Sequence, residues 1–170
     1  NTGQVRRLID EAAACGLTVS LVIAPHGSLG PLARNDEKAL ADEKAYIQRI
    51  VGEFRNDPRI VLWDLYNEPK DWGGQYRLIQ RRILWAREMG PTQPLTASIY
   101  HWLPDIKKDY PGRAETEAMA DVHNFHLYDC SAGAMAGIEQ MVATLKAISD
   151  RPMVCTECLA RTRGDTFGRI

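Results

Sequence analysis

Two glutamates stand where a carboxylate can take part in a reaction. Glu68 lies in Asn67-Glu68-Pro69, directly after the apolar run 60–66. Glu157 lies near the end of a second apolar run, residues 153–158. A carboxylate among apolar residues is costly unless it is paired or functional. A simple turn would also explain the first segment, because Asn and Pro favour turns, and its glutamate would then be solvated.

A third apolar run ends in the segment 123–128. Because side chains alternate across a strand, Asn124, His126 and Tyr128 should share one face, while His123 faces the other way. We interpret His123 as structural. The three segments together place two carboxylates, an amide, an imidazole and a phenol at the ends of three predicted strands.

Glycoside hydrolysis uses side chains of these types. One carboxyl group must protonate the leaving oxygen, and a second must either attack the anomeric carbon or activate water. An amide beside the acid can hydrogen-bond the sugar 2-hydroxyl group, and a tyrosine can hold the nucleophile ionised and oriented. We expect no metal ion and no organic cofactor.

The elements that position these residues alternate between strand and helix periods. Extended apolar runs begin near residues 17, 60, 95, 122 and 153, at intervals of 43, 35, 27 and 31 residues. Stripes at helical spacing lie between them, with Asn35 expected as the N-cap of the second helix. This alternation predicts a parallel α/β sheet with right-handed crossovers. No glycine-rich phosphate-binding motif follows any strand, which disfavours a nucleotide-binding fold.

The order of these segments resembles the clan-A retaining glycoside hydrolases, and most closely the family 5 (cellulase-like) members. In that family Asn-Glu-Pro ends barrel strand 4, His-x-Tyr ends strand 6 and the nucleophile ends strand 7. The corresponding motifs here are Asn67-Glu68-Pro69, His126-Leu127-Tyr128 and Glu157. The stretch 155–164 is also similar to a bacterial subgroup often labelled cellulase or 1,4-β-xylanase.

The resemblance implies a (β/α)8 TIM barrel, with residues 1–170 forming part of one catalytic domain. Strands 3 to 7 would be present, while strands 1, 2 and 8 would be missing and are expected from the full-length chain. The N-terminus is interpreted as processed or truncated, so the sequence predicts no compartment.

The resemblance also implies roles for individual residues. Glu68 is the expected acid/base and Glu157 the expected nucleophile. Asn67 is expected to bind the sugar 2-hydroxyl group, Tyr128 to orient Glu157, and His126 to lie beside the reacting sugar. Four further substrate-binding residues are expected in loops at the rim of the barrel: His26, Trp72, His101 and Trp102.

Two residues of the run 60–66 lie outside this set. We expect Trp63 in the core or facing a helix. Asp64 is expected to point into the barrel with Leu62 and Tyr66. A carboxylate there needs a cationic partner, which a missing strand would supply.

The composition and charge of the chain limit the kinds of binding partner that we expect. The 21 Lys and Arg residues nearly balance the 22 Asp and Glu residues, so no charge excess favours nucleic acid. No run reaches the roughly 18–20 apolar residues that span a bilayer, so no membrane partner is expected. Cys155-Thr156-Glu157-Cys158 has the spacing of a zinc or redox pair, but no second ligand pair completes a zinc site. The expected partner is a β-linked carbohydrate.

Three alternatives stay open at this point. The first is a non-catalytic carbohydrate-binding scaffold derived from such an enzyme, against which the presence of both glutamates argues. The second is a transglycosylase that uses the same residues, and the third is a barrel enzyme unrelated to sugars. The glycan itself is not determined, since glucan, mannan and xylan enzymes share this constellation.

Overall fold

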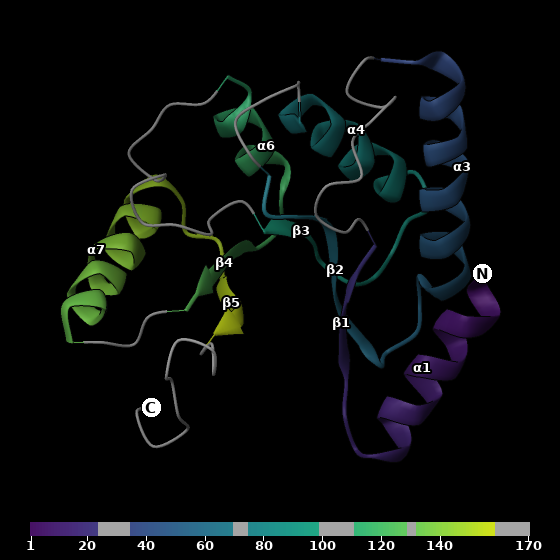
Figure 1. Ribbon diagram of the computed structural model, residues 1–170, viewed down its shortest axis with the longest axis horizontal. Helices are drawn as coiled ribbons and strands as arrows, with labels where there is room; N and C mark the ends of the chain where they lie inside the picture. The colour runs from purple at the N-terminus through teal and green to yellow at the C-terminus, as the bar shows by residue number, and fades with distance from the viewer. Residues whose placement is uncertain (24–34, 70–74, 99–110, 129–131, 159–170) are drawn as a thin grey trace.

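A computed structural model describes residues 1–23, 35–69, 75–98, 111–128 and 132–158. Helices and strands alternate along the described chain (Figure 1). Their order is α1 (Thr2–Ala14), β1 (Val19–Val22), α3 (Glu37–Phe54), β2 (Ile60–Asn67), α4 (Gln75–Arg87), β3 (Leu95–Ser98), α6 (Arg113–Met119), β4 (His123–Leu127), α7 (Ala132–Ile148) and β5 (Met153–Cys158). The predicted alternation is confirmed, and each predicted apolar run contains one strand.

The strands are parallel and follow one another in chain order. β1, β2 and β3 form one sheet, and β4 and β5 form another. β3 lies beside the start of β4, where the Thr96 hydroxyl donates to the Val122 carbonyl over 2.7 Å. Sequential order without a reversal is typical of a (β/α) barrel, whereas a doubly wound sheet reverses its strand order at a switch point. In Figure 1 the helices form a layer that runs from the left, over the top, to the right of the row of strands.

The core lies between the strands and this helix layer. α3 turns one stripe inward, at spacings of three and four residues. Its buried members are Ile47, Ile50, Val51 and Phe54. Among the described helices, none is both long and apolar enough to cross a membrane.

The start of α3 differs from the expectation by one residue. Asp36 is the N-cap, and its side chain accepts a hydrogen bond from the Ala39 amide over 2.8 Å. The predicted cap, Asn35, precedes it with a φ of 56°. Asn tolerates this left-handed conformation better than most residues, so Asn35 turns the chain into the cap.

The side chain of Gln93 connects β2 to the segment that precedes it. The indole of Trp63 donates to Gln93 over 3.1 Å, and the Gln93 amide donates to the carbonyls of Phe54 and Asp57. Trp63 is fully buried, which confirms its predicted place in the core.

A buried cation joins α4 to β2 and α3. Arg82 is 1% exposed, donates to the Leu65 carbonyl over 3.0 Å and pairs with Glu43 of α3. Its guanidinium also lies 5.3 Å from the ring centroid of Tyr66. Burial lowers the pKa of Arg82, while the Glu43 carboxylate opposes that shift. The pair therefore keeps a charge inside the helix layer and fixes α4 against the strand.

We expect Arg82→Met to lower the free energy of unfolding by about 3 kcal/mol, because it leaves the Glu43 carboxylate without this cation. Arg77 lies on the same helix and is exposed, so Arg77→Met is the matched control. The control should change stability by less than about 0.5 kcal/mol. Denaturant unfolding of both variants measures the difference, and equal losses would contradict the role given to Arg82.

Candidate active site

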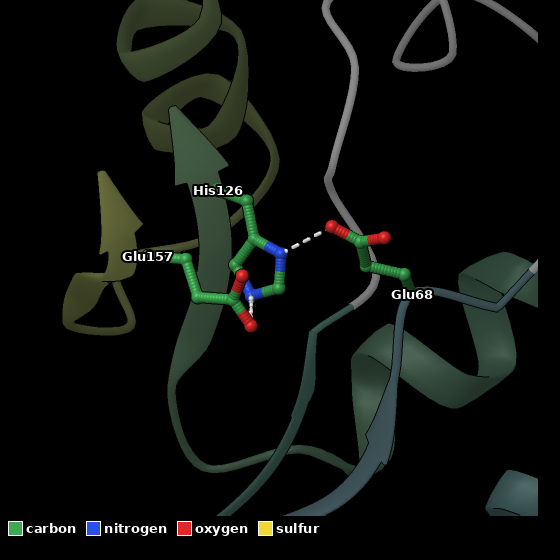
Figure 2. Close-up of side chains that lie close together, drawn as sticks. All are labelled: Glu68, His126 and Glu157. Atoms are coloured by element: carbon green, nitrogen blue, oxygen red, sulfur yellow. Dashed lines mark hydrogen bonds and ion pairs between the residues drawn. The ribbon is translucent and has the colours of Figure 1, made fainter. Parts of the chain in front are cut away.

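Three side chains meet near the carboxyl ends of β2, β4 and β5 (Figure 2). Nδ1 of His126 lies 2.7 Å from Oε1 of Glu68, and Nε2 lies 3.6 Å from Oε1 of Glu157. A carboxylate oxygen of Glu68 also lies within 4.8 Å of one of Glu157. The imidazole is buried, whereas the Glu68 and Glu157 side chains are 21% and 40% exposed. Both carboxylates can therefore be reached from outside.

Tyr128 completes this group just beyond β4. Its hydroxyl donates to Oε2 of Glu157, and its ring meets that of His126 edge-on, with centroids 6.2 Å apart. Of the two Glu157 oxygens, Oε2 is thus occupied by the phenol and Oε1 faces the imidazole.

Asn67 is the last residue of β2 and directly precedes Glu68. Its side-chain oxygen is buried and has no hydrogen-bond partner among the described residues. A buried acceptor without a donor is costly, so this atom is suited to a donor on a ligand.

The backbone of β2 changes register just before the glutamate. Asp64 pairs with Thr96 and Asn67 with Ser98, so three steps along β2 oppose two along β3. The extra residue is a β-bulge, which bends a strand and re-aims the side chains that follow. Glu68 comes directly after it and has a φ of 47°. That conformation costs an ordinary residue on the order of 1 kcal/mol or more, so the surroundings must hold it.

Side chains on both faces of β2 satisfy the backbone of this bulge. The Tyr66 amide donates to Oδ1 of Asp64 over 3.1 Å, and the Leu65 carbonyl accepts from Arg82. Tyr66 therefore lies against Arg82 in the helix layer, while Asp64 reaches Ser98 on β3. The prediction that Asp64 and Tyr66 share one face is wrong, because the bulge breaks the alternation on which it rested.

β5 carries a second bulge beside the other glutamate. Phe125 pairs with Cys155 and His126 with Glu157, so Thr156 is the extra residue. Its hydroxyl donates to Oδ1 of Asn124 over 2.6 Å. Each glutamate of the group thus follows a bulge.

Asp64 lies beneath the site and is 1% exposed. Its donors are the Ser98 hydroxyl, the Asn124 amide at 2.9 Å and the Tyr66 backbone. Burial raises the pKa of Asp64 to about 6, and the bonds from Ser98 and Tyr66 and the charge of His126 oppose the shift. The sequence predicted a cationic partner, but the hydrogen-bond donors that surround Asp64 in the described part of the chain are neutral.

This raised pKa gives the stability of the fold a pH dependence of defined sign. The unfolded carboxyl group keeps its ordinary value of 3.8, so between pH 4 and 6 only the folded state holds the proton. The contribution of Asp64 to stability is complete below pH 4 and is lost as pH rises through 6. Wild type should therefore lose free energy of unfolding between pH 4 and pH 7, and Asp64→Asn should not. The stability of Asp64→Asn relative to wild type should rise by on the order of 2–3 kcal/mol over this range.

Denaturant unfolding at both pH values measures this gain. Asp150 is exposed, so Asp150→Asn is the control and should show no comparable change. A stability difference between Asp64→Asn and wild type that stays constant with pH would contradict the raised pKa.

The structure brings together five of the residues singled out in the sequence: Asn67, Glu68, His126, Tyr128 and Glu157. The expected rim contacts His26, Trp72, His101 and Trp102 lie outside the described residues. Sequence reasoning missed Ser98 and Thr156, whose signal was a small polar residue inside each of two apolar runs. His123 is buried at the start of β4, away from the group.

Among the described residues, Glu68, His126 and Glu157 also form a group whose atoms could contact a metal ion. Those atoms all lie within 4.8 Å of one another. The imidazole lies between the two carboxylates, with Nδ1 toward Glu68 and Nε2 toward Glu157.

Parallel strands in chain order, with two carboxylates at their carboxyl ends, define the class of (β/α)-barrel proteins with a glycosidase-like site. A family model described as "Cellulase (glycosyl hydrolase family 5)" matches residues 1–159. The chain belongs to this family, whose fold is the TIM barrel. No curated protein matches the sequence.

The solved structures with a similar fold include β-glucuronidases. One from an uncultured Clostridium sp. has a TM-score of 0.64 and 18% identity, over 90% of this chain and 27% of that chain. Another, from Ruminococcus gnavus in complex with uronic deoxynojirimycin, has a TM-score of 0.56 and 18% identity, over 88% of this chain and 27% of that chain. The chain thus spans about a quarter of the length of the structures it matches.

Proposed function

We propose that the protein containing this chain hydrolyses a β-linked oligo- or polysaccharide with retention of configuration. Glu68 acts as acid/base and Glu157 as nucleophile. The observation that carries the proposal is the approach of their carboxylate oxygens to within 4.8 Å. Retaining glycosidases hold the two carboxyl groups about 5–5.5 Å apart, whereas inverting ones need about 6.5–9.5 Å to admit a water molecule.

The contacts of Glu157 suit a nucleophile. The Tyr128 hydroxyl donates to Oε2, which holds the orientation of the carboxylate. Oε1 is then the oxygen that attacks the anomeric carbon, and it lies beside the imidazole of His126. The result is a covalent glycosyl-enzyme.

The contacts of Glu68 suit a residue that must change its protonation state. Either Oε1 of Glu68 or Nδ1 of His126 can carry the proton between them, so their 2.7 Å contact holds both states. Protonated Glu68 protonates the leaving oxygen in the first step. Ionised Glu68 then activates the water that releases the product.

Asn67 is placed to bind the sugar. Its buried oxygen has no partner among the described residues and adjoins the acid/base, so it is available to the 2-hydroxyl group of the reacting ring. Hydrogen bonds to that hydroxyl strengthen in the transition state of glycosidases. His126 lies between the two carboxylates, beside the same ring.

We also propose that strands outside these residues complete the barrel. Within the described part, β1 pairs only with β2, and the apolar side chains of Leu17 and Val22 near it are 60% and 45% exposed. An open strand edge with exposed apolar residues favours further pairing. The catalytic experiments below therefore use the full-length protein.

Stereochemistry tests the mechanism. Hydrolysis of a panel of aryl β-glycosides identifies the sugar, and proton NMR then shows the anomer formed first. We expect the β product, because two inversions restore the starting configuration. An initial α product would exclude the retaining mechanism, and no hydrolysis of any panel member would favour a non-catalytic scaffold.

Azide separates the roles of the two glutamates. Glu157→Gly should lose activity and regain turnover in azide as an α-glycosyl azide, since the small anion replaces the nucleophile. Glu68→Ala should give a β-glycosyl azide, because Glu157 still forms the intermediate. Glu115 is exposed on α6, so Glu115→Ala should behave as wild type. Azide products of the opposite configurations would mean that the roles are exchanged.

A further inference from the structure

Four adjacent strands each contribute one polar side chain to a row beneath the catalytic glutamates. The residues are Asp64 on β2, Ser98 on β3, Asn124 on β4 and Thr156 on β5. The first three are buried and Thr156 is partly buried. Asp64, Asn124 and Thr156 precede Glu68, His126 and Glu157, respectively, along the chain, and Ser98 ends β3 at the level of Asn67.

The hydrogen bonds of the row all point the same way. Thr156 donates to Oδ1 of Asn124 over 2.6 Å. The Asn124 amide donates to Oδ2 of Asp64 at 2.9 Å and to the Ser98 hydroxyl at 2.8 Å. Ser98 in turn donates to Oδ2 of Asp64, and the Tyr66 backbone donates to Oδ1. The carboxylate therefore orients every donor in the row.

The two ends of the row coincide with the two bulges. Asp64 accepts from the backbone of the bulge that precedes Glu68, and Thr156 is the bulged residue that precedes Glu157. A bulge decides where the next side chains point. Asn124 bonds to both ends and so links the two strands that carry the carboxylates.

We propose that Asp64 is a positioning residue which, through Asn124 and Thr156, sets the distance between Glu68 and Glu157. This proposal rests on the proposed glycosidase function. The hydrogen bonds of this row connect the bulge in β2 to the bulge in β5. A change at Asp64 therefore displaces both glutamates from their reactive geometry.

Stability alone does not explain this carboxylate. A buried charge surrounded by neutral donors costs free energy, and an apolar residue of similar volume would be tolerated better. The carboxylate instead fixes the orientation of its neighbours, because its two oxygens accept hydrogen bonds from three donors at once. An asparagine at this position would turn an amide donor toward that of Asn124 and reverse part of the row.

The test measures kcat, KM and melting temperature in the full-length protein. A misplacement near 1 Å can cost about 100-fold in rate, so Asp64→Asn should lower kcat by about 30- to 100-fold with KM changed less than about threefold. Thr156→Val should lower kcat by about tenfold, and Thr156→Ser, which keeps the hydroxyl, should restore most of it. Thr144 donates its hydroxyl on α7 instead, so Thr144→Val is the control for losing such a bond.

The leaving group distinguishes positioning from a loss of stability. Asp64 supports the bulge before the acid, so Asp64→Asn should slow a phenyl β-glycoside more than a dinitrophenyl one, which needs little protonation. A purely structural role would lower both rates equally, in proportion to the folded fraction.

The outcomes separate the two proposals. If Glu68→Ala and Glu157→Gly abolish hydrolysis while Asp64→Asn and Thr156→Val keep kcat within twofold of wild type, the positioning role is wrong and the proposed function stands. If the glutamate variants stay active, the proposed function fails first. Equal rates for Thr156→Val and Thr156→Ser would also overturn the positioning role.

Discussion

The β-bulge between Asp64 and Asn67 is the constraint on which the site depends. One extra residue removes backbone groups from the ladder, and leaving such groups buried and unpaired costs about 1–3 kcal/mol each. The Asp64 carboxylate accepts a hydrogen bond from the Tyr66 amide. On the side of the helix layer, Arg82 donates to the Leu65 carbonyl. These two bonds allow Tyr66 to pack outward and Glu68 to leave the strand in a left-handed conformation.

The charges are distributed according to their surroundings. The buried cation Arg82 has a carboxylate partner, whereas the buried anion Asp64 is held by neutral donors. The two glutamates at the rim keep partial exposure and contact a histidine and a tyrosine. Fixed groups deeper in the fold thus support accessible groups above them, which is how a site keeps its geometry while a substrate enters.

The family match concerns the sequence of this chain, whereas the likeness to solved structures concerns its fold alone. The family 5 match covers residues 1–159, while the β-glucuronidases share the fold at 18% identity. At that identity most side chains differ, and the common feature is a set of parallel strands whose carboxyl ends meet at one rim. Barrel folds support many chemistries by variation of their loops, so under the proposed function the choice of glycan depends on residues outside this frame.

The sequence by itself determined the alternation of strands and helices, their order, and which residue types follow each strand, because these depend on local periodicity and neighbouring residues. It did not determine where the alternation breaks. The bulges in β2 and β5 contain no glycine or proline to mark them, and one extra residue inverts every prediction of facing beyond it. Only the tertiary structure decided the partners of Asp64 and the approach of Glu68 to Glu157, since these contacts join residues such as Asp64 and Asn124 that are 60 positions apart.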